Sequence, residues 1–475
     1  MNALQTYLTL RAAHEHRAIP KTMKRHVHRS AHPLVIVGYH LAGDVGAPLA
    51  LLWGTDPRYP QSVVVPEPRD RQLRFDALAV FGQALVDYLL GFVATGFSAG
   101  RAGQAESVCI DAPQIVVPNR ATAEWLFGIV GRFTRYPINS NPVPAPIVSI
   151  AGQHLSFFHD LLPGSNLVLP VTEMLSTHWQ TGQLPSEDLN LSALLGWIAP
   201  GVGMDGPTAA RCGEALAPAG PLSDPNWDAY VLSDFIRQWH AAKTDERQSV
   251  AVRRALDAEI RRQLSHTWED CWRALRLVDT LPEARSVAAR WEQDRARWTH
   301  HHLAMTAGTA RFRIIPTPVQ SAKALERLER ATTELEASMA LDDPYVMASY
   351  VASGEALSAR VVNIDTTRKV QGDKRRVCRP LVTLEPLLSF TKPVGTVLFL
   401  ASNPSVEFEI LGIDKQRVHA QVNKGAVSPK TFSCLPNTGE VVVLSPFGAR
   451  DFYRRPEHSE IPWTHRLPES VEEQP

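Results

Sequence analysis

One acidic residue in the first third of the chain lies where a metal-dependent reaction would need it. Asp111 directly follows the apolar run at residues 107–110, and a carboxylate at the end of a strand can hold a divalent metal ion. Folding could gather other acids of this region around it, namely Asp44, Asp56, Glu67, Asp70 and Glu124. Asp44 and Asp56, however, lie in turns that contain Gly or Pro, where acids are common for local reasons. Asp111 is therefore the one weak catalytic candidate, and we expect no cofactor unless the chain is a nuclease that uses Mg²⁺ or Mn²⁺.

Three consecutive histidines, His300, His301 and His302, resemble a metal-binding tract. They fall within a segment that we expect to be helical. Successive residues of a helix point about 100° apart, so three in a row cannot face one ion. We predict no metal site here.

The clearest local excess of positive charge lies late in the chain. Only Asp365 and Asp373 oppose it nearby. The basic residues are Arg360, Arg368, Lys369, Lys374, Arg375, Arg376 and Arg379. Two interpretations are open: a solvated hairpin, or a contact with the phosphates of a nucleic acid.

The overall composition limits the class of protein. Lys plus Arg equals Asp plus Glu at 49 each, so no global positive field indicates a nucleic-acid partner. The five cysteines form no CxxC pair, which favours reduced thiols in a cytoplasmic protein. Neither a phosphate-binding GxxxxGK[ST] loop nor an HExxH zinc motif occurs, and we expect no signal peptide or membrane helix.

Residues 34–145 are expected to form the domain around which the chain is built. Apolar runs at residues 34–37, 48–53 and 62–65 predict three strands, followed by a helix over residues 69–93. A fourth strand at residues 107–110 and a helix over residues 120–133, with Asn119 as its N-cap, complete the pattern. This order is that of the ribonuclease H-like fold, a mixed α/β sheet whose nucleases carry acids on the first and fourth strands. The first strand instead offers Gly38, Tyr39 and His40, which predicts a catalytically degenerate domain.

Residues 146–345 are expected to form a helical domain, because closely spaced prolines near residue 145 mark a boundary. From Ser249, apolar residues recur every fourth position, which predicts one long packed helix. These residues are Val252, Leu256, Ile260, Leu264, Trp268 and Trp272. A second helix, over residues 284–305, interleaves arginines with Trp291 and Trp298. These tryptophans belong either to the core or to a surface that stacks on bases.

Residues 355–448 change to short alternating runs bounded by turns. The six predicted strands cover residues 357–364, 381–384, 395–400, 406–411, 417–422 and 439–444. They favour a small antiparallel β-barrel of the OB or SH3-like kind. Residues 449–475 are expected to be an extended tail. Residues 1–33 are expected to be a basic N-terminal arm, with a short helix before a linker that is either solvated or in contact with phosphate or a partner.

Three short segments carry a resemblance that spans most of the chain: residues 46–54 (GAPLALLWG), 115–121 (IVVPNRA) and 462–465 (PWTH). Together they resemble uncharacterised bacterial proteins that accompany helicase or ATPase genes. The resemblance implies an accessory component of a nucleic-acid-processing or antiviral defence complex. The late barrel is also similar to barrels inserted in superfamily 1 helicases.

The function we expect is therefore that of a non-catalytic, nucleic-acid-associated scaffold or accessory subunit. DNA or RNA and a helicase or ATPase are the expected partners, with no membrane involved. Two alternatives stay open: a divalent-metal nuclease centred on Asp111, and an adaptor that binds proteins alone.

Overall fold

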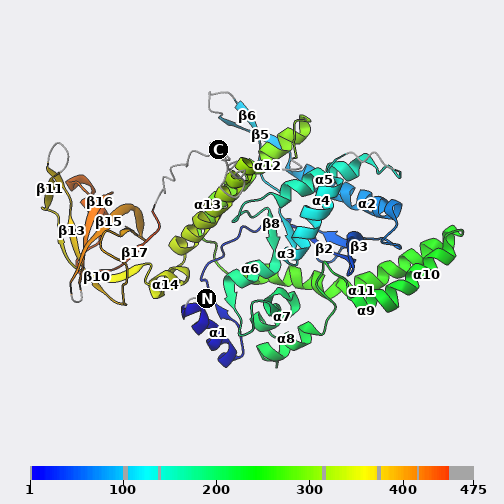
Figure 1. The fold of residues 1–475 in the computed structure, drawn as a ribbon, viewed down its shortest axis with the longest axis horizontal. Coiled ribbons are helices and arrows are strands. Elements are labelled where there is room, and N and C mark those ends of the chain that lie inside the picture. Colours follow the sequence, from blue (N-terminus) through cyan, green and yellow to red (C-terminus); the bar gives the residue numbers. More distant parts are fainter. Residues whose placement is uncertain are drawn as a thin grey trace, which may run out of the picture. The chain divides into compact units, whose positions relative to one another are not determined.

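The chain forms two compact units, which are shown in the computed structural model of Figure 1. The structure describes residues 3–99, 105–136, 141–312, 317–371, 376–414 and 417–448. One unit is Leu8–Ile315, and the other is Pro316–Pro475 together with Met1–Tyr7. The boundary expected near residue 145 thus falls inside the first unit, and the end of the expected helical domain belongs to the second.

A five-stranded mixed sheet lies at the centre of the first unit. Its strands are β2 (Leu34–Leu41), β3 (Asp44–Gly54), β4 (Gln61–Val64), β7 (Ile115–Val117) and β8 (Val168–Pro170). The spatial order is β4-β3-β2-β7-β8. The first three strands run antiparallel, whereas β7 is parallel to β2 and β8 is parallel to β7. All eight residues of β2 are buried, as expected of a strand covered on both faces.

The prediction that residues 107–110 form the fourth strand of this sheet is wrong. They overlap β6 (Ala105–Cys109), which pairs with β5 (Ala94–Ala99) in a separate hairpin. The strand next to β2 is β7, where Leu34 pairs with Ile115. Three residues flanked by Pro113 and Pro118 give too short a run for a periodicity to show.

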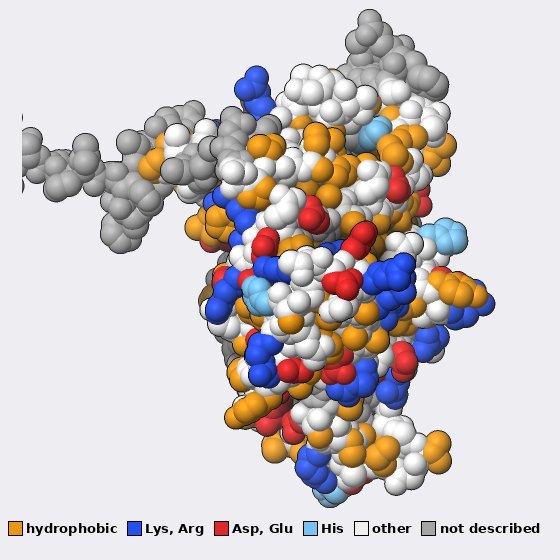
Figure 2. Space-filling model, turned by 90° about the vertical axis from the view of Figure 1, so that its right-hand side faces the viewer, with side chains coloured by type: hydrophobic (Ala, Val, Ile, Leu, Met, Phe, Trp, Pro, Cys, Tyr) orange, Lys and Arg blue, Asp and Glu red, His pale blue; other side chains and the backbone are white. Residues whose placement is uncertain are grey.

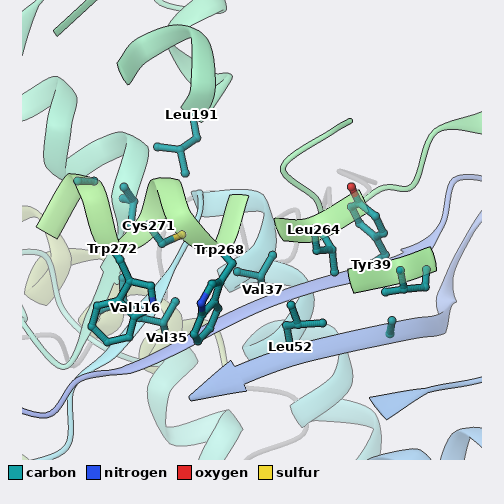
Figure 3. Close-up of a cluster of buried hydrophobic side chains, with 14 of the residues drawn as sticks. Val35, Val37, Tyr39, Leu52, Val116, Leu191, Leu264, Trp268, Cys271 and Trp272 are labelled. Carbon is teal, nitrogen blue, oxygen red and sulfur yellow. The ribbon is translucent and has the colours of Figure 1, made fainter. Parts of the chain in front are cut away.

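One face of the sheet is covered by α11 (Glu246–Val278). The predicted stripe is confirmed, because Leu256, Ile260 and Leu264 are fully buried. Figure 3 shows Leu264, Trp268, Cys271 and Trp272 above Val35, Val37 and Leu52 of the sheet, with Leu191 on the far side of α11. Residues four apart on α11 meet alternate residues of β2, which is why the two periodicities fit together.

The other face is covered by α2 (Arg71–Leu89), by the helical run that begins at Arg120, and by α5 (Pro146–His159) and α12 (Arg285–Thr306). The second core contains Ile36 and Trp53 of the sheet together with Phe81, Leu85 and Trp298 of the helices. Residues 71–92 are long and apolar enough to cross a membrane, and 33% of this window is buried in the structure. Phe81, Leu85 and Leu89 of α2 contribute to this core.

The remaining elements of this unit are short, apart from the first helix. They are α1 (Ala3–Glu15), which begins in residues assigned to the other unit, β1 (Ile19–Pro20), α3 (Arg120–Ala123), α4 (Gly131–Thr134), α6 (Val171–His178), β9 (Trp179–Gln180), α7 (Leu191–Ile198), α8 (Gly206–Glu214), α9 (Pro225–Trp227) and α10 (Ser233–Ala242). A π-helical segment, Glu124–Val130, joins α3 to α4.

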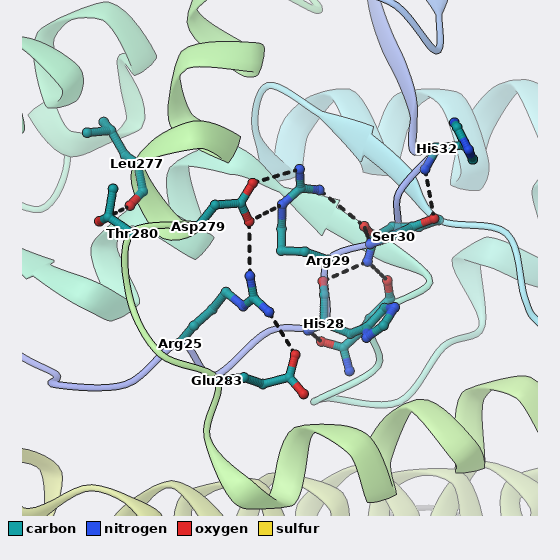
Figure 4. A network of polar contacts seen from close by, with 11 residues as sticks. Arg25, His28, Arg29, Ser30, His32, Leu277, Asp279, Thr280 and Glu283 are labelled. Atoms are coloured by element: carbon teal, nitrogen blue, oxygen red, sulfur yellow. Dashed lines mark hydrogen bonds and ion pairs between the residues drawn. The ribbon is translucent and has the colours of Figure 1, made fainter.

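The basic N-terminal segment is fixed to the first unit. Arg25 donates to Asp279 at 3.0 Å and to Glu283 at 2.7 Å, and Arg29 donates to Asp279 at 3.1 Å (Figure 4). The side chains of Arg25 and Arg29 are 15% and 10% exposed. The segment after α1 is therefore not a solvated linker, because the turn between α11 and α12 supplies acids that neutralise it.

The second unit contains the predicted small antiparallel barrel. Its six strands are β10 (Leu357–Asp365), β13 (Leu381–Pro386), β14 (Val397–Leu400), β15 (Asn403–Asp414), β16 (Arg417–Lys424) and β17 (Val441–Ser445). They close in the order β10-β13-β16-β15-β14-β17, and all six coincide with predicted strands. Alternate residues such as Val382, Leu384 and Phe408 fill the interior.

Further helices and strands accompany the barrel. Two helices precede it, α13 (Pro318–Asp342) and α14 (Pro344–Ala352). A short hairpin of β11 (Lys369–Gln371) and β12 (Arg376–Cys378) lies between β10 and β13. This hairpin carries much of the predicted basic cluster.

Candidate functional site

The side chain of Asp111 forms hydrogen bonds that stabilise the fold. Its Oδ1 atom accepts a hydrogen bond from the indole nitrogen of Trp291 at 3.0 Å and another from the backbone of Ala112 at 2.8 Å. Within the described ranges, no three His, Cys, Asp or Glu side chains are grouped so that they could hold a metal ion. The hydrogen bonds of Asp111 to Trp291 and Ala112 thus give this residue a role in the fold.

The carboxyl ends of β2 and β7 are where an open α/β sheet usually binds its ligand. Here residues 217–223 of the same chain, which we call the crossing segment, occupy that place. Asn119, just past β7, donates to the carbonyl of Gly220 at 2.9 Å, and its oxygen caps α3 by accepting from Thr122. The backbone of His40 donates to Pro221 at 2.7 Å. These bonds fasten the crossing segment to the sheet.

Gly220 makes this close approach possible. Its φ is +92°, and a Cβ atom there would lie 2.5 Å from the carbonyl oxygen of Gly38. A side chain would therefore be strained and would clash with β2. Tyr39 adds a hydrogen bond from its hydroxyl to Pro218. The end of the sheet is consequently filled by the chain's own backbone.

The histidine tract contributes to the core of the first unit. His301 is buried, and its ring lies 3.0 Å from the Nδ1 atom of His154 on α5 and stacks on Phe157. Burial lowers the pKa of His154 to about 4 and that of His301 to about 3, and charge on neighbouring histidines acts in the same direction. The pair is therefore neutral at neutral pH, and one ring nitrogen donates to the other.

We expect this pair to make the stability of the first unit depend on pH. Below about pH 6.5, the ordinary pKa of histidine, both residues are protonated in the unfolded chain but stay neutral in the folded core. The free energy of unfolding therefore decreases as the pH falls from about 6.5 toward about 4. At pH 5 the loss should be about 2 kcal/mol for each histidine. Urea unfolding of the wild type and of the variant His154→Leu with His301→Leu, at about pH 7.5 and about pH 5, measures it. An equal pH dependence in both proteins would contradict the assignment.

Several arginines of the helical region pair with acids close by in the sequence. Arg261 pairs with Asp257 at 2.9 Å, and Arg262 pairs with Glu259 at 2.6 Å. Arg295, beside the buried tryptophans of α12, pairs with Glu292 at 2.5 Å. Figure 2 shows basic and acidic side chains interspersed over the face on which α10 lies. The core interpretation of Trp291 and Trp298 is confirmed, since they are 8% and 0% exposed.

The basic residues of the barrel differ from those of the first unit. Arg368 and Arg379 form the base of the β11–β12 hairpin, where the backbone of Arg379 donates to Arg368 at 3.0 Å. Both side chains reach β16, with Arg368 donating to Gln421 Oε1 at 2.6 Å and Arg379 to the carbonyl of Asn423 at 2.9 Å. The two guanidinium groups are thus held by neutral acceptors.

Lys369 and Arg376 lie on the hairpin itself, and both are exposed. Lys369 pairs with Cys378 across the two strands, and Gln371 pairs with Arg376. Because side chains alternate along a strand, these four residues lie on one face of the hairpin. Arg376 also donates to the carbonyl of Lys369 at 3.2 Å. We call Arg368, Lys369, Arg376 and Arg379 the hairpin cluster.

The other predicted members of the basic site stand apart from this cluster. Arg360 lies on β10 opposite Glu385, and its guanidinium donates to the carbonyl of Gly439 at 3.2 Å. A carboxylate directly across the strand partly offsets its charge. Lys374 and Arg375 lie outside the described residues.

The hairpin cluster forms no ion pair with any residue that the structure describes. The charge of Arg368 acts on the carboxylate of Asp365. The pKa of Asp365 is lowered, first by hydrogen bonds from Thr367 and least by the charge of Arg368. Four cations held by neutral partners or exposed to solvent can bind an anion with several negative charges, such as a phosphate backbone.

A cavity of about 470 Å³ lies beside the β2–β3 turn and was not anticipated from the sequence. Its wall is mainly apolar, with Glu67, Arg69 and Asp228 among the charged residues. Glu67 already pairs with Lys243 at 3.1 Å, and Asp228 accepts from the backbone of Ala42 at 3.1 Å. The cavity therefore combines an apolar wall with carboxylates that contact neighbouring segments of the chain.

Two short motifs in the sequence are not in the context that their chemistry requires. The pattern GxSxG at residues 96–100 places Ser98 inside β5, whereas a nucleophilic serine needs a sharp turn between strand and helix. The pattern GxGxxG at residues 201–206 follows helix α7, whereas a dinucleotide site needs a preceding strand. Neither pattern indicates an active site.

Comparisons of the chain with models of protein families, with curated proteins and with solved structures found no match.

Proposed function

We propose that this chain is a non-catalytic nucleic-acid-binding protein of the cytoplasm, acting as an accessory subunit beside a helicase or another ATPase. The observation that carries the proposal is the hairpin cluster, whose four positive side chains form no ion pair with a described carboxylate. A phosphate backbone supplies the missing negative charge, and binding would release its condensed counterions.

The architecture of the first unit supports a ribonuclease H-like assignment. Three antiparallel strands, a helix and, after the β5–β6 hairpin, two further strands parallel to the first follow one another along the chain, which is compatible with this fold. The positions that would carry acids hold other residues: Gly38, Tyr39 and His40 on the first strand, and Asn119 after the fourth. A sheet of this kind without acids at these positions supports holding rather than cutting.

The barrel supports the binding part of the proposal. An OB or SH3-like barrel presents one face to oligonucleotides, and its loops adjust the specificity. This barrel closes with six strands, one more than the five of an OB fold. Its hairpin between the first two strands carries the cationic surface.

The variant Arg376→Glu should bind nucleic acid more weakly than the wild type by several-fold. The reason is that one phosphate contact is replaced by a repulsion. The slope of log affinity against log salt should fall by about 1. Fluorescence anisotropy with labelled duplexes and single strands, at salt concentrations between about 50 and 200 mM, measures both quantities.

Lys430→Glu is a matched control, because Lys430 is an exposed lysine of the same unit in the segment between β16 and β17. It should bind like the wild type. If the wild type binds no nucleic acid even at low salt, the proposal fails. If the wild type then recovers an ATPase partner, the adaptor alternative is favoured.

A further inference from the structure

We infer that the hairpin cluster recognises double-stranded DNA through its backbone, in preference to single strands. The inference rests on the proposed function and names the form of nucleic acid that the site takes. It depends on which side chains surround the cluster, and on which kinds are missing from the sequence there.

The hairpin that carries the cluster, its flanking strands β10 and β13, and β16, which holds the two guanidinium groups, offer no Phe, Tyr or Trp to stack on a base. From residue 357 to residue 386, and again along β16, the sequence contains no Phe, Tyr or Trp. Proteins that hold single strands rely on aromatic stacking, which is worth about 1–3 kcal/mol per base. Without it, a flexible single strand would offer phosphates alone and would have to be ordered on binding. The composition therefore disfavours a single-stranded ligand.

The shape of the hairpin suits a groove. β11 and β12 form a two-stranded antiparallel ribbon with three residue pairs, and the major groove of B-form DNA, about 12 Å wide, admits such a ribbon. Lys369 and Arg376 share one face of the ribbon, while Val370 and Val377 pair on the other. The charged face would then contact phosphates along one wall of the groove.

The two arginines at the base of the ribbon are held in place to contact phosphates that flank the groove. Gln421 and the carbonyl of Asn423 fix the guanidinium groups of Arg368 and Arg379, so these groups lose little freedom on binding. A planar guanidinium can donate two parallel hydrogen bonds to one phosphate. A duplex carries one charge per about 1.7 Å of axis, twice the density of a single strand. Its phosphates can therefore contact the ribbon and the arginines at its base at the same time.

The shape of the major groove also differs between DNA and RNA duplexes. The major groove of an A-form RNA duplex is deep and narrow, and side chains cannot read it. A ribbon of two strands is wider than a side chain, so it is excluded from this narrow groove as well. We therefore expect DNA duplexes to bind more tightly than RNA duplexes of the same length.

Fluorescence anisotropy of the full chain with four labelled ligands tests the inference. The ligands are two DNA duplexes of unrelated sequence, one matching DNA single strand and one RNA duplex, all spanning about two helical turns. We expect the two DNA duplexes to bind alike, about tenfold more tightly than the single strand or the RNA duplex. The variant Arg376→Glu should reduce this preference, whereas Lys430→Glu should leave it unchanged.

The outcomes separate the inference from the proposed function. If the single strand or the RNA duplex binds as tightly as the DNA duplexes, and Arg376→Glu weakens that binding, the duplex inference is overturned and the binding site remains. If none of the four ligands binds at low salt, the proposed function fails as well. A strong preference between the two DNA sequences would overturn recognition through the backbone.

Discussion

Replacing Trp298 with alanine is expected to lower the free energy of unfolding of the first unit by about 3–5 kcal/mol. Trp298 is fully buried, and its indole nitrogen donates to the carbonyl of Phe92 at 2.8 Å. Its ring contacts Phe158 and His154 of α5, with centroid distances of 6.2 and 6.1 Å. The substitution leaves a large cavity and an unsatisfied carbonyl in one core. Urea unfolding followed by tryptophan fluorescence measures the loss.

The matched control is Tyr230→Ala, another loss of an aromatic ring from the same unit. Tyr230 is 79% exposed, so its replacement should change the stability by less than about 0.5 kcal/mol. The variant Trp298→Phe should lie between the two, because it keeps part of the ring volume. A loss below about 1 kcal/mol for Trp298→Ala would show that α12 does not depend on this contact.

Reversing both charges at the base of the hairpin, Arg368→Glu with Arg379→Glu, is expected to remove nearly all binding of nucleic acid. Two phosphate contacts are lost and two repulsions are added. The slope of log affinity against log salt should therefore decrease by at least about 2. A salt series followed by fluorescence anisotropy gives the slope, and circular dichroism tests whether the barrel remains folded.

Two comparisons make this second prediction specific. The double reversal Lys392→Glu with Lys430→Glu changes the net charge of the same unit by the same amount and should bind nearly as the wild type. The double variant Arg368→Lys with Arg379→Lys keeps the charge but loses the planar fork, so it should bind with intermediate affinity. If both reversals weaken binding equally, the effect comes from net charge and not from the hairpin cluster.

The elements with strong periodicity could be predicted from the sequence. Apolar residues at every fourth position from Val252 to Trp272 predicted α11. The alternation of apolar and polar residues after residue 354 predicted the six strands of the barrel. These patterns are local, because each reports which face of its own element is buried. They led to the hairpin and therefore to the candidate site.

The elements that depend on distant partners could not be predicted. β7 is only three residues long, and its identity as a strand comes from pairing with β2 and β8. The crossing segment meets Asn119 and Gly38 through contacts about a hundred residues or more away in the chain. Arg25 meets Asp279 in the same way. A single sequence contains no local signal for such contacts, so neither the filled end of the sheet nor the fixed N-terminal segment could be foreseen.

The sharing of both cores between early and late residues affects how the protein must be made. β2 and β3 are synthesised first, yet α11, which covers one of their faces, ends only at Val278, and α12, which completes the core on the other side, ends at Thr306. During translation, the face of the sheet that α11 covers stays open to water until the ribosome has completed most of the first unit. A gene fragment that ends near residue 145 would leave this face bare and should yield aggregated material. A fragment that extends to about residue 315 would contain α11 and α12 and is the natural choice for producing this unit alone.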